Sequence, residues 1–233
     1  MFDTAAIAFL RDLKENNDRE WFQPRKEQYE KLFREPMLRA VEAVNRKFES
    51  VAPDYITDPA KAVYRIYRDT RFSPDKTPYK THIGALLWHK RLGKNGGAVF
   101  YFHLSAEEFL IAGGLYHAPP ADMVKFRTHI AEHHQRMTKI LISRPVREKF
   151  GGLQGDKLSR PPKGHSADHP AIEYLKYKDL LLEITLPPET AAGKSAISTL
   201  TSHLCAMAPF IEFLNEPALN QLRRSRDPLL IRA

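Results

Sequence analysis

The spacing of apolar residues changes twice along this chain, and this change limits the possible folds more than any other feature. Apolar positions recur every three or four residues up to residue 52 and again from residue 196. Between residues 63 and 116 they alternate with polar residues or form short runs. The first spacing predicts amphipathic helices and the second predicts strands. We therefore expect an α+β fold, a mostly antiparallel sheet covered by N-terminal and C-terminal helices.

The predicted elements follow one another within a single domain. Residues 1–52 are expected to be helical, 63–116 to form the sheet core and 119–150 to be helical, before a loop at 151–169 and a last strand and long helix at 170–221. Four segments in the sheet core have the alternation or the apolar run of a strand: Val63–Tyr67, His82–His89, Val99–Leu104 and Phe109–Leu115.

Residues with special backbone roles predict where helices begin and break. Thr4 can cap a helix that runs through Leu10, and Asn17 with Glu20 has the spacing of a capping box. Pro209 lies within the long C-terminal helical pattern, where a proline removes a backbone hydrogen bond. We expect Pro209 to kink or divide that helix.

Charge and cysteine content narrow the classes of function. The chain has 36 Lys and Arg against 28 Asp and Glu, a formal net charge of +8, which favours an anionic partner such as nucleic acid or a nucleotide. Cys205 is the single cysteine, so a disulfide within the chain and a cysteine-based zinc site are excluded. The N-terminus does not read as a signal peptide, and no apolar run approaches the roughly 20 residues of a membrane span. We expect a cytoplasmic protein without membrane contact; the sequence indicates neither a cofactor nor an oligomeric state.

The densest chemistry lies in the segment Arg65–His82, which we call the basic loop. It holds five lysines and arginines against two aspartates, with aromatic residues and two prolines among them. Because prolines fix φ, the loop is expected to be stiff and to hold its cations in place for a phosphate or another oxyanion. The expected ligand-binding residues are Arg65, Arg68, Arg71, Lys76, Tyr79, Lys80 and His82, with Tyr79 or Phe72 as a stacking face.

The alternative interpretation of the basic loop is structural. In that case Asp69 and Asp75 pair with neighbouring cations, and the aromatic rings belong to the core.

Two further segments are candidates for a site. Gly113 and Gly114 end an apolar strand, where paired glycines permit the close approach of a ligand or, alternatively, a bulge that curves the sheet. Asp168 and His169 can act as an acid–base pair, and Asp69 is a further candidate catalytic carboxylate. The alternative for Asp168 and His169 is a helix cap, because a proline and an acidic residue follow them.

Four pieces of the sequence carry a resemblance to a known family. They are Asn16–Phe22, Arg65–His82, Gly113–Tyr116 and Asp168–Pro170. Together they resemble a group of conserved hypothetical proteins catalogued as a domain of unknown function (number two thousand four hundred and sixty-one), over most of the chain. The resemblance implies a shared fold and a shared site, and it implies no reaction, cofactor or catalytic residue.

Three functions are compatible with these observations. The first is binding of a phosphate-bearing ligand, such as nucleic acid or a nucleotide, through the basic loop. The second is an enzyme that acts on such a ligand with an Asp/His site. The third is a module that uses the loop to bind a protein partner.

Overall fold

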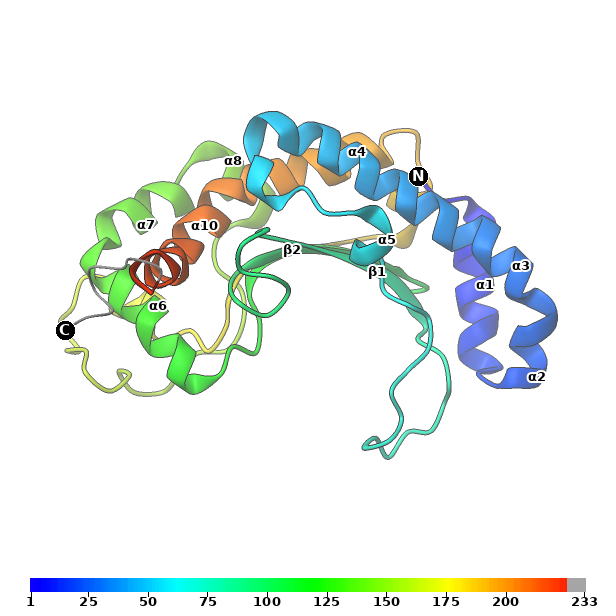
Figure 1. Cartoon of the computed structure of the whole chain (residues 1–233), viewed down its shortest axis with the longest axis horizontal. Coiled ribbons are helices and arrows are strands. Elements are labelled where there is room, and N and C mark those ends of the chain that lie inside the picture. The colour runs from blue at the N-terminus through cyan, green and yellow to red at the C-terminus, as the bar shows by residue number, and fades with distance from the viewer. Residues whose placement is uncertain (226–233) are drawn as a thin grey trace. The chain divides into compact units, whose positions relative to one another are not determined.

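The computed structural model describes residues 1–225 and contains, in that range, a four-stranded antiparallel sheet (Figure 1). The spatial order of the strands, β1-β2-β3-β4, is also their order in the sequence. They are β1 (His82–Trp88), β2 (Val99–Ser105), β3 (Phe109–Leu115) and β4 (Leu180–Leu186). Helices precede β1 and follow β4, so the predicted α+β fold with N-terminal and C-terminal helices is confirmed.

The helices before β1 are α1 (Thr4–Glu15), α2 (Arg19–Phe22), α3 (Lys26–Tyr29), α4 (Glu35–Val51) and α5 (Pro59–Ala62). Between them lie 3-10 turns at Gln23–Arg25 and Pro53–Tyr55 and a π-helical turn at Glu30–Arg34. Those between β3 and β4 are α6 (Pro120–Glu132), α7 (His134–Leu141), α8 (Arg144–Phe150) and α9 (Ile172–Leu175). After β4, a 3-10 turn at Pro188–Ala191 leads to α10 (Ala196–Arg224).

Aspartates cap the first two helices in place of the residues expected. Asp3 and Asp18 each accept a hydrogen bond from a backbone N–H in the first turn of the helix that follows. The prediction of Thr4 and Asn17 as caps is therefore wrong. In both cases the carboxylate neighbour takes the position, where its charge also suits the positive end of the helix dipole.

The segment predicted as the first strand, Val63–Tyr67, does not form a continuous strand. Val63 and Tyr67 make isolated antiparallel bridges to Ala85 and Tyr79. The Tyr67–Tyr79 bridge closes the basic loop as an irregular hairpin, which projects away from β1 in Figure 1. The alternation that predicted a strand thus belongs to the base of a loop.

The helix α10 runs undivided through Pro209 and Pro217, contrary to the expectation that Pro209 could divide it. Its apolar residues Leu204, Phe210 and Leu214 have no exposed surface, and this packing outweighs the local effect of a proline. By length and composition alone α10 could cross a membrane, but the burial of these residues is that of a core helix. The absence of membrane contact stays a prediction.

The described chain falls into two compact units. Unit 1 comprises residues 1–87, 101–111 and 185–203, and unit 2 comprises residues 88–100, 112–184 and those from 204 onward. Each unit has its own buried aromatic residues, such as Phe33 in unit 1 and Phe126 in unit 2. The basic loop lies wholly within unit 1.

Candidate functional site

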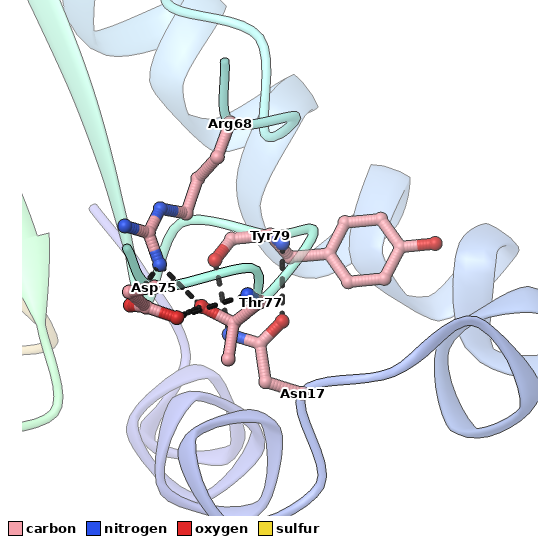
Figure 2. A network of polar contacts seen from close by, with 5 residues as sticks. All are labelled: Asn17, Arg68, Asp75, Thr77 and Tyr79. Atoms are coloured by element: carbon pink, nitrogen blue, oxygen red, sulfur yellow. Dashed lines mark hydrogen bonds and ion pairs between the residues drawn. The ribbon is translucent and has the colours of Figure 1, made fainter. Parts of the chain in front are cut away.

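Asn17 fastens the basic loop to the helices of unit 1 (Figure 2). Its amide nitrogen donates to the backbone carbonyl of Tyr79 at 2.9 Å, and its amide oxygen accepts from the backbone N–H of Tyr79 at 3.0 Å. The Tyr79 ring is only 1% exposed and stacks on Phe22, with 4.1 Å between the ring centroids. These contacts join Asn16–Phe22 to Arg65–His82, two of the segments on which the family resemblance rests.

Within the loop, Arg68 is held by Asp75 and Thr77 (Figure 2). Its Nη1 atom donates to the carboxylate of Asp75 and to the hydroxyl of Thr77, and Asp75 also accepts from the backbone N–H of Thr77 at 2.9 Å. The guanidinium of Arg68 is the main reason that the pKa of Asp75 falls to about 2, so the pair is ionised at neutral pH. Since a guanidinium has five N–H donors and Nη1 makes these contacts, the remaining edge of Arg68 can still donate to a ligand.

Most of the other loop cations also have internal partners. Arg71 forms a bidentate ion pair with Asp69, in which Nε lies 3.0 Å from one carboxylate oxygen and Nη2 lies 2.7 Å from the other. Lys76 and Lys80 each donate through Nζ to a backbone carbonyl 2.9 Å away. Among residues 1–225, the side chain of Arg65 has neither a hydrogen bond nor an ion pair. The structural interpretation of the loop therefore accounts for Arg71 and Asp69, whereas Arg65 remains available to an anion.

A pocket of about 270 Å³ lies where the two joined segments meet, and we call it the arginine pocket. It is lined by Arg19, Gln23, Tyr67, Arg68, Thr70, Pro78 and Tyr79. In the described part of the chain the exposed guanidinium of Arg19 has no hydrogen bond or ion pair. Two arginines therefore line one small pocket, and the single carboxylate that pairs with either of them is Asp75.

The two aromatic residues expected to stack on a ligand differ in exposure. The ring of Tyr79 is buried against Phe22, so that face is already occupied. Phe72 is 92% exposed at the tip of the loop, and the guanidinium carbon of Arg71 lies 5.7 Å from its ring centroid. Phe72 is thus the residue that offers a free stacking face.

In unit 2, Gly113 and Gly114 meet protein rather than open space. A Cβ atom on Gly113 would lie 2.4 Å from Sδ of Met207, and one on Gly114 would lie 1.9 Å from the carbonyl oxygen of Leu180. Gly114 also has a φ of +139°, which residues with side chains rarely adopt. The packing of unit 2 alone therefore requires glycine at position 114, whereas a side chain at position 113 would displace the flexible end of Met207. The role of both glycines in ligand binding stays a prediction.

Asp168 and His169, also in unit 2, lie in the turn that precedes α9. Nδ1 of His169 accepts from the backbone N–H of Ala171 at 3.0 Å, and the backbone N–H of Asp168 donates to Oγ of Ser166 at 3.3 Å. These contacts stabilise the turn, but the N-cap of α9 is Ala171 and no side chain caps that helix, so the capping interpretation is wrong for Asp168 and His169. A catalytic role of the pair stays a prediction. In the described residues, no group of three or more His, Cys, Asp or Glu side chains is arranged to hold a metal ion.

A second polar group in unit 1, which we call the sheet cluster, consists of Tyr101, His103, Glu108 and His82. Sequence reasoning named His82 as a ligand-binding residue and missed the other three. Nδ1 of His103 lies 3.1 Å from the Tyr101 hydroxyl, and its Nε2 lies 3.0 Å from a carboxylate oxygen of Glu108. The ring of His82, on the neighbouring strand, is 5.1 Å from that of His103. The available signal was the two-residue spacing of Tyr101 and His103, which places both on one face of β2.

Fold and site together define an α+β protein with a small cationic pocket and a polar cluster on its sheet. More particularly, the chain belongs to the family DUF2461, described as a conserved hypothetical protein, whose profile matches residues 5–213. This confirms the resemblance drawn from the four motifs. No curated protein and no solved structure matches the chain.

Proposed function

We propose that this protein binds a phosphate-bearing ligand in the arginine pocket. The observation that carries the proposal is the position of Arg19, a guanidinium without a partner in residues 1–225, on the same pocket as Arg68. Guanidinium groups match phosphate oxygens with two parallel hydrogen bonds, and two of them around one pocket favour a dianionic group. The basic character of the chain, with its net charge of +8, draws such ligands toward it.

The neutral lining of the pocket suits the same ligand. Thr70 supplies a hydroxyl and Gln23 an amide, both of which can bind phosphate or sugar oxygens. At about 270 Å³ the pocket is slightly smaller than the roughly 300–1,000 Å³ of most small-molecule sites. We infer that the pocket binds a phosphate group with a small substituent, such as the phosphate end of one nucleotide.

The test is isothermal titration calorimetry, which measures the affinity of the protein for inorganic phosphate and for adenosine monophosphate. A charge-assisted hydrogen bond contributes roughly 1.5–3 kcal/mol, so Arg19→Ala should weaken binding by roughly 10-fold to 150-fold. Arg11→Ala is the matched control, because Arg11 is also exposed in unit 1 and does not line the pocket. Equal affinity of the two variants, or no binding of either compound at millimolar concentration, would refute the proposal.

The exposure of Phe72 favours a second ligand, single-stranded nucleic acid. A base can stack on the free ring while Arg71 and Lys76 approach the backbone, and such stacking contributes roughly 1–3 kcal/mol per base. If four cations contact the strand, the logarithm of affinity should fall with the logarithm of salt at a slope of about −2.8. Phe72→Ala should weaken binding of a labelled oligonucleotide at fixed salt. If the affinity does not depend on salt concentration, single-stranded nucleic acid is excluded and a nucleotide stays the proposed ligand.

A further inference from the structure

The sheet cluster has the geometry of a catalytic group, although no motif in the sequence indicates one. We propose that Tyr101, His103 and Glu108 form an acid–base relay that exchanges protons with a substrate through the Tyr101 hydroxyl. The three side chains are connected in series through the two nitrogens of one imidazole, at 3.1 Å and 3.0 Å. A reacting hydroxyl, a base and an orienting carboxylate in hydrogen-bond contact are the parts by which enzymes activate weak nucleophiles.

The hydrogen bonds fix the tautomer of His103. A carboxylate only accepts hydrogen bonds, so Glu108 requires the proton of the neutral imidazole to be on Nε2. Nδ1 is then left with a lone pair, and it accepts the O–H of Tyr101. The relay is therefore oriented in one direction, from the phenol toward the imidazole.

Burial sets the resting protonation state of the relay. The side chain of His103 is 13% exposed, and its burial lowers its pKa despite the opposing effect of Glu108. His103 is consequently neutral at pH 7 and able to accept a proton. Burial raises the pKa of Tyr101, so the phenol is protonated in the resting state, and the charge of Glu108 offsets part of the cost of moving that proton to His103. The other titratable groups nearby are His82, Tyr64 and Lys80, and burial lowers the pKa of both His82 and Lys80.

The backbone around the cluster holds these side chains in place. A Cβ atom on Gly84 of β1 would lie 2.9 Å from the Tyr101 hydroxyl and 3.1 Å from Cβ of His103, so glycine makes room for both. Glu108 ends the turn between β2 and β3, where Oγ of Ser105 accepts from its backbone N–H at 3.0 Å. Strand and turn thus set the relay geometry before any ligand arrives.

The neighbouring charges indicate an anionic substrate. Nζ of Lys80 lies 5.1 Å from the ring centroid of Tyr64, whose ring is 6.4 Å from that of Tyr101. Lys80 donates to the backbone carbonyl of Arg65, and within residues 1–225 no salt bridge pairs either cation with a carboxylate, although the charge of Arg65 contributes to the lowered pKa of Asp69. Burial and, to a smaller extent, repulsion from Arg65 lower the pKa of Lys80, and an anionic substrate group would offset both effects. The substrate class is therefore an anion with a hydroxyl, or an anion attacked by water.

Protons are conserved in the proposed step, and no oxidant or reductant is needed. As the substrate or water oxygen bonds to the electrophilic atom of the anion, the bond between that atom and the leaving group breaks, and the proton of the attacking oxygen passes to Oη of Tyr101. The original phenol proton passes at the same time to Nδ1 of His103, and Glu108 stabilises the resulting imidazolium. The imidazolium then returns its proton through Tyr101 to the leaving group.

The relay can be tested without knowledge of the substrate by labelling with benzenesulfonyl fluoride. In this reaction an Oη–S bond forms, the S–F bond breaks, fluoride leaves and the phenol proton moves to His103. Peptide mass spectrometry gives the rate at each tyrosine, and Tyr116, which is 66% exposed, serves as the internal reference. We expect Tyr101 to react at least about tenfold faster than Tyr116 despite its lower exposure. A slower reaction at Tyr101 would overturn the proposal.

Variants separate a relay from simple exposure. His103→Gln should lower the Tyr101/Tyr116 rate ratio on the order of a hundredfold, and Glu108→Gln about tenfold, because general bases typically contribute factors of this size. Glu107→Gln is the matched control: Glu107 lies in the same turn but pairs with Lys14 at 2.6 Å, so the ratio should not change. If His103→Gln does not fold, Glu108→Gln decides. An unchanged ratio in Glu108→Gln, or an equal fall in Glu107→Gln, rejects the relay. Arg11→Ala, which lies outside both sites, should leave the ratio unchanged.

Discussion

The basic loop and the sheet cluster lie in the same unit, but they use their polar residues in opposite ways. The loop has many charges close together in the sequence, and those charges largely pair with one another, as Arg71 does with Asp69 and Arg68 with Asp75. The sheet cluster has few polar residues, spread from His82 to Glu108, and places them in series. A high density of charge in a sequence therefore indicates a polar loop more reliably than it indicates which cations are free.

The two regions also differ in how strongly solvent weakens their polar contacts. Arg71 is exposed over 77% of its side chain, so solvent and salt screen its pair with Asp69 and the pair contributes little to stability. His103 is largely buried, and its contacts act in a medium of lower dielectric constant where they are stronger. We therefore expect substitutions in the loop to alter binding with little effect on folding, except where the loop is anchored.

The largest expected effect concerns that anchor. Asn17→Ala removes both hydrogen bonds to the backbone of Tyr79 and leaves a partly buried N–H and C=O without partners, which should cost about 2–4 kcal/mol. For a chain of this size the melting temperature should fall by roughly 5–15 °C. Asn16→Ala is the control, since the Asn16 amide bonds only the exposed carbonyl of Asp12, and it should melt near the parent. If the two variants melt alike, the loop is held by its ion pairs and the contrast between the regions fails.

The second prediction concerns pH and the sheet cluster. Burial, together with His103 and Lys80, lowers the pKa of His82 to about 4. Because this folded-state value is below the usual 6.5, its effect on stability is absent above pH 6.5, and stability falls as the pH drops from 6.5 toward 4. The loss by pH 4 should be on the order of 1–2 kcal/mol once solvent screening is allowed for. Denaturant unfolding from pH 7 to pH 4 measures it, and His82→Gln should lose less stability than the parent over that range. Parallel curves would mean that His82 does not titrate with a lowered pKa.

The sequence predicts the strands and most helices because those signals are local. His82–Trp88 and Phe109–Leu115 are recognisable from alternation or a short apolar run. The prediction of a strand at Val63–Tyr67 is wrong, because an alternating pattern also occurs where a segment forms only isolated β-bridges. The structural interpretation of the basic loop included the pairing of Asp69 with a neighbouring cation. That pairing is also local, because Asp69 and Arg71 are two residues apart.

What the sequence could not predict depends on contacts between distant segments. Asn17 is of a residue type that often caps helices. Nothing near it in the sequence indicates that its amide binds the backbone of Tyr79, 62 residues away. The sheet cluster requires the register between β1 and β2, which sets His82 beside His103. Arg19 became a candidate only when its helix met the loop at the arginine pocket.

A third prediction tests whether Asp75 competes with the ligand for Arg68. Asp75→Asn removes the charge that Arg68 now neutralises but keeps a group that can accept a hydrogen bond. If Arg68 helps to hold the phosphate, the affinity for inorganic phosphate should rise roughly threefold to tenfold. Asp69→Asn is the control, because it releases Arg71, which does not line the pocket, and its phosphate affinity should match the parent. A loss of affinity in Asp75→Asn would show that Asp75 orients Arg68 instead of competing for it.

The smallest expected effect is that of Arg71→Ala, although Arg71 lies in the densest charge cluster of the sequence. Its guanidinium is exposed, both of its side-chain hydrogen bonds go to Asp69, and it lies outside the arginine pocket. The melting temperature should therefore change by about a degree or less, and phosphate affinity by less than about twofold. An oligonucleotide that stacks on Phe72 would respond differently, because loss of one phosphate contact should make the salt slope about 0.7 shallower. A tenfold loss of phosphate affinity in Arg71→Ala, with Arg19→Ala unaffected, would place the anion at the loop tip and remove the arginine pocket as its site.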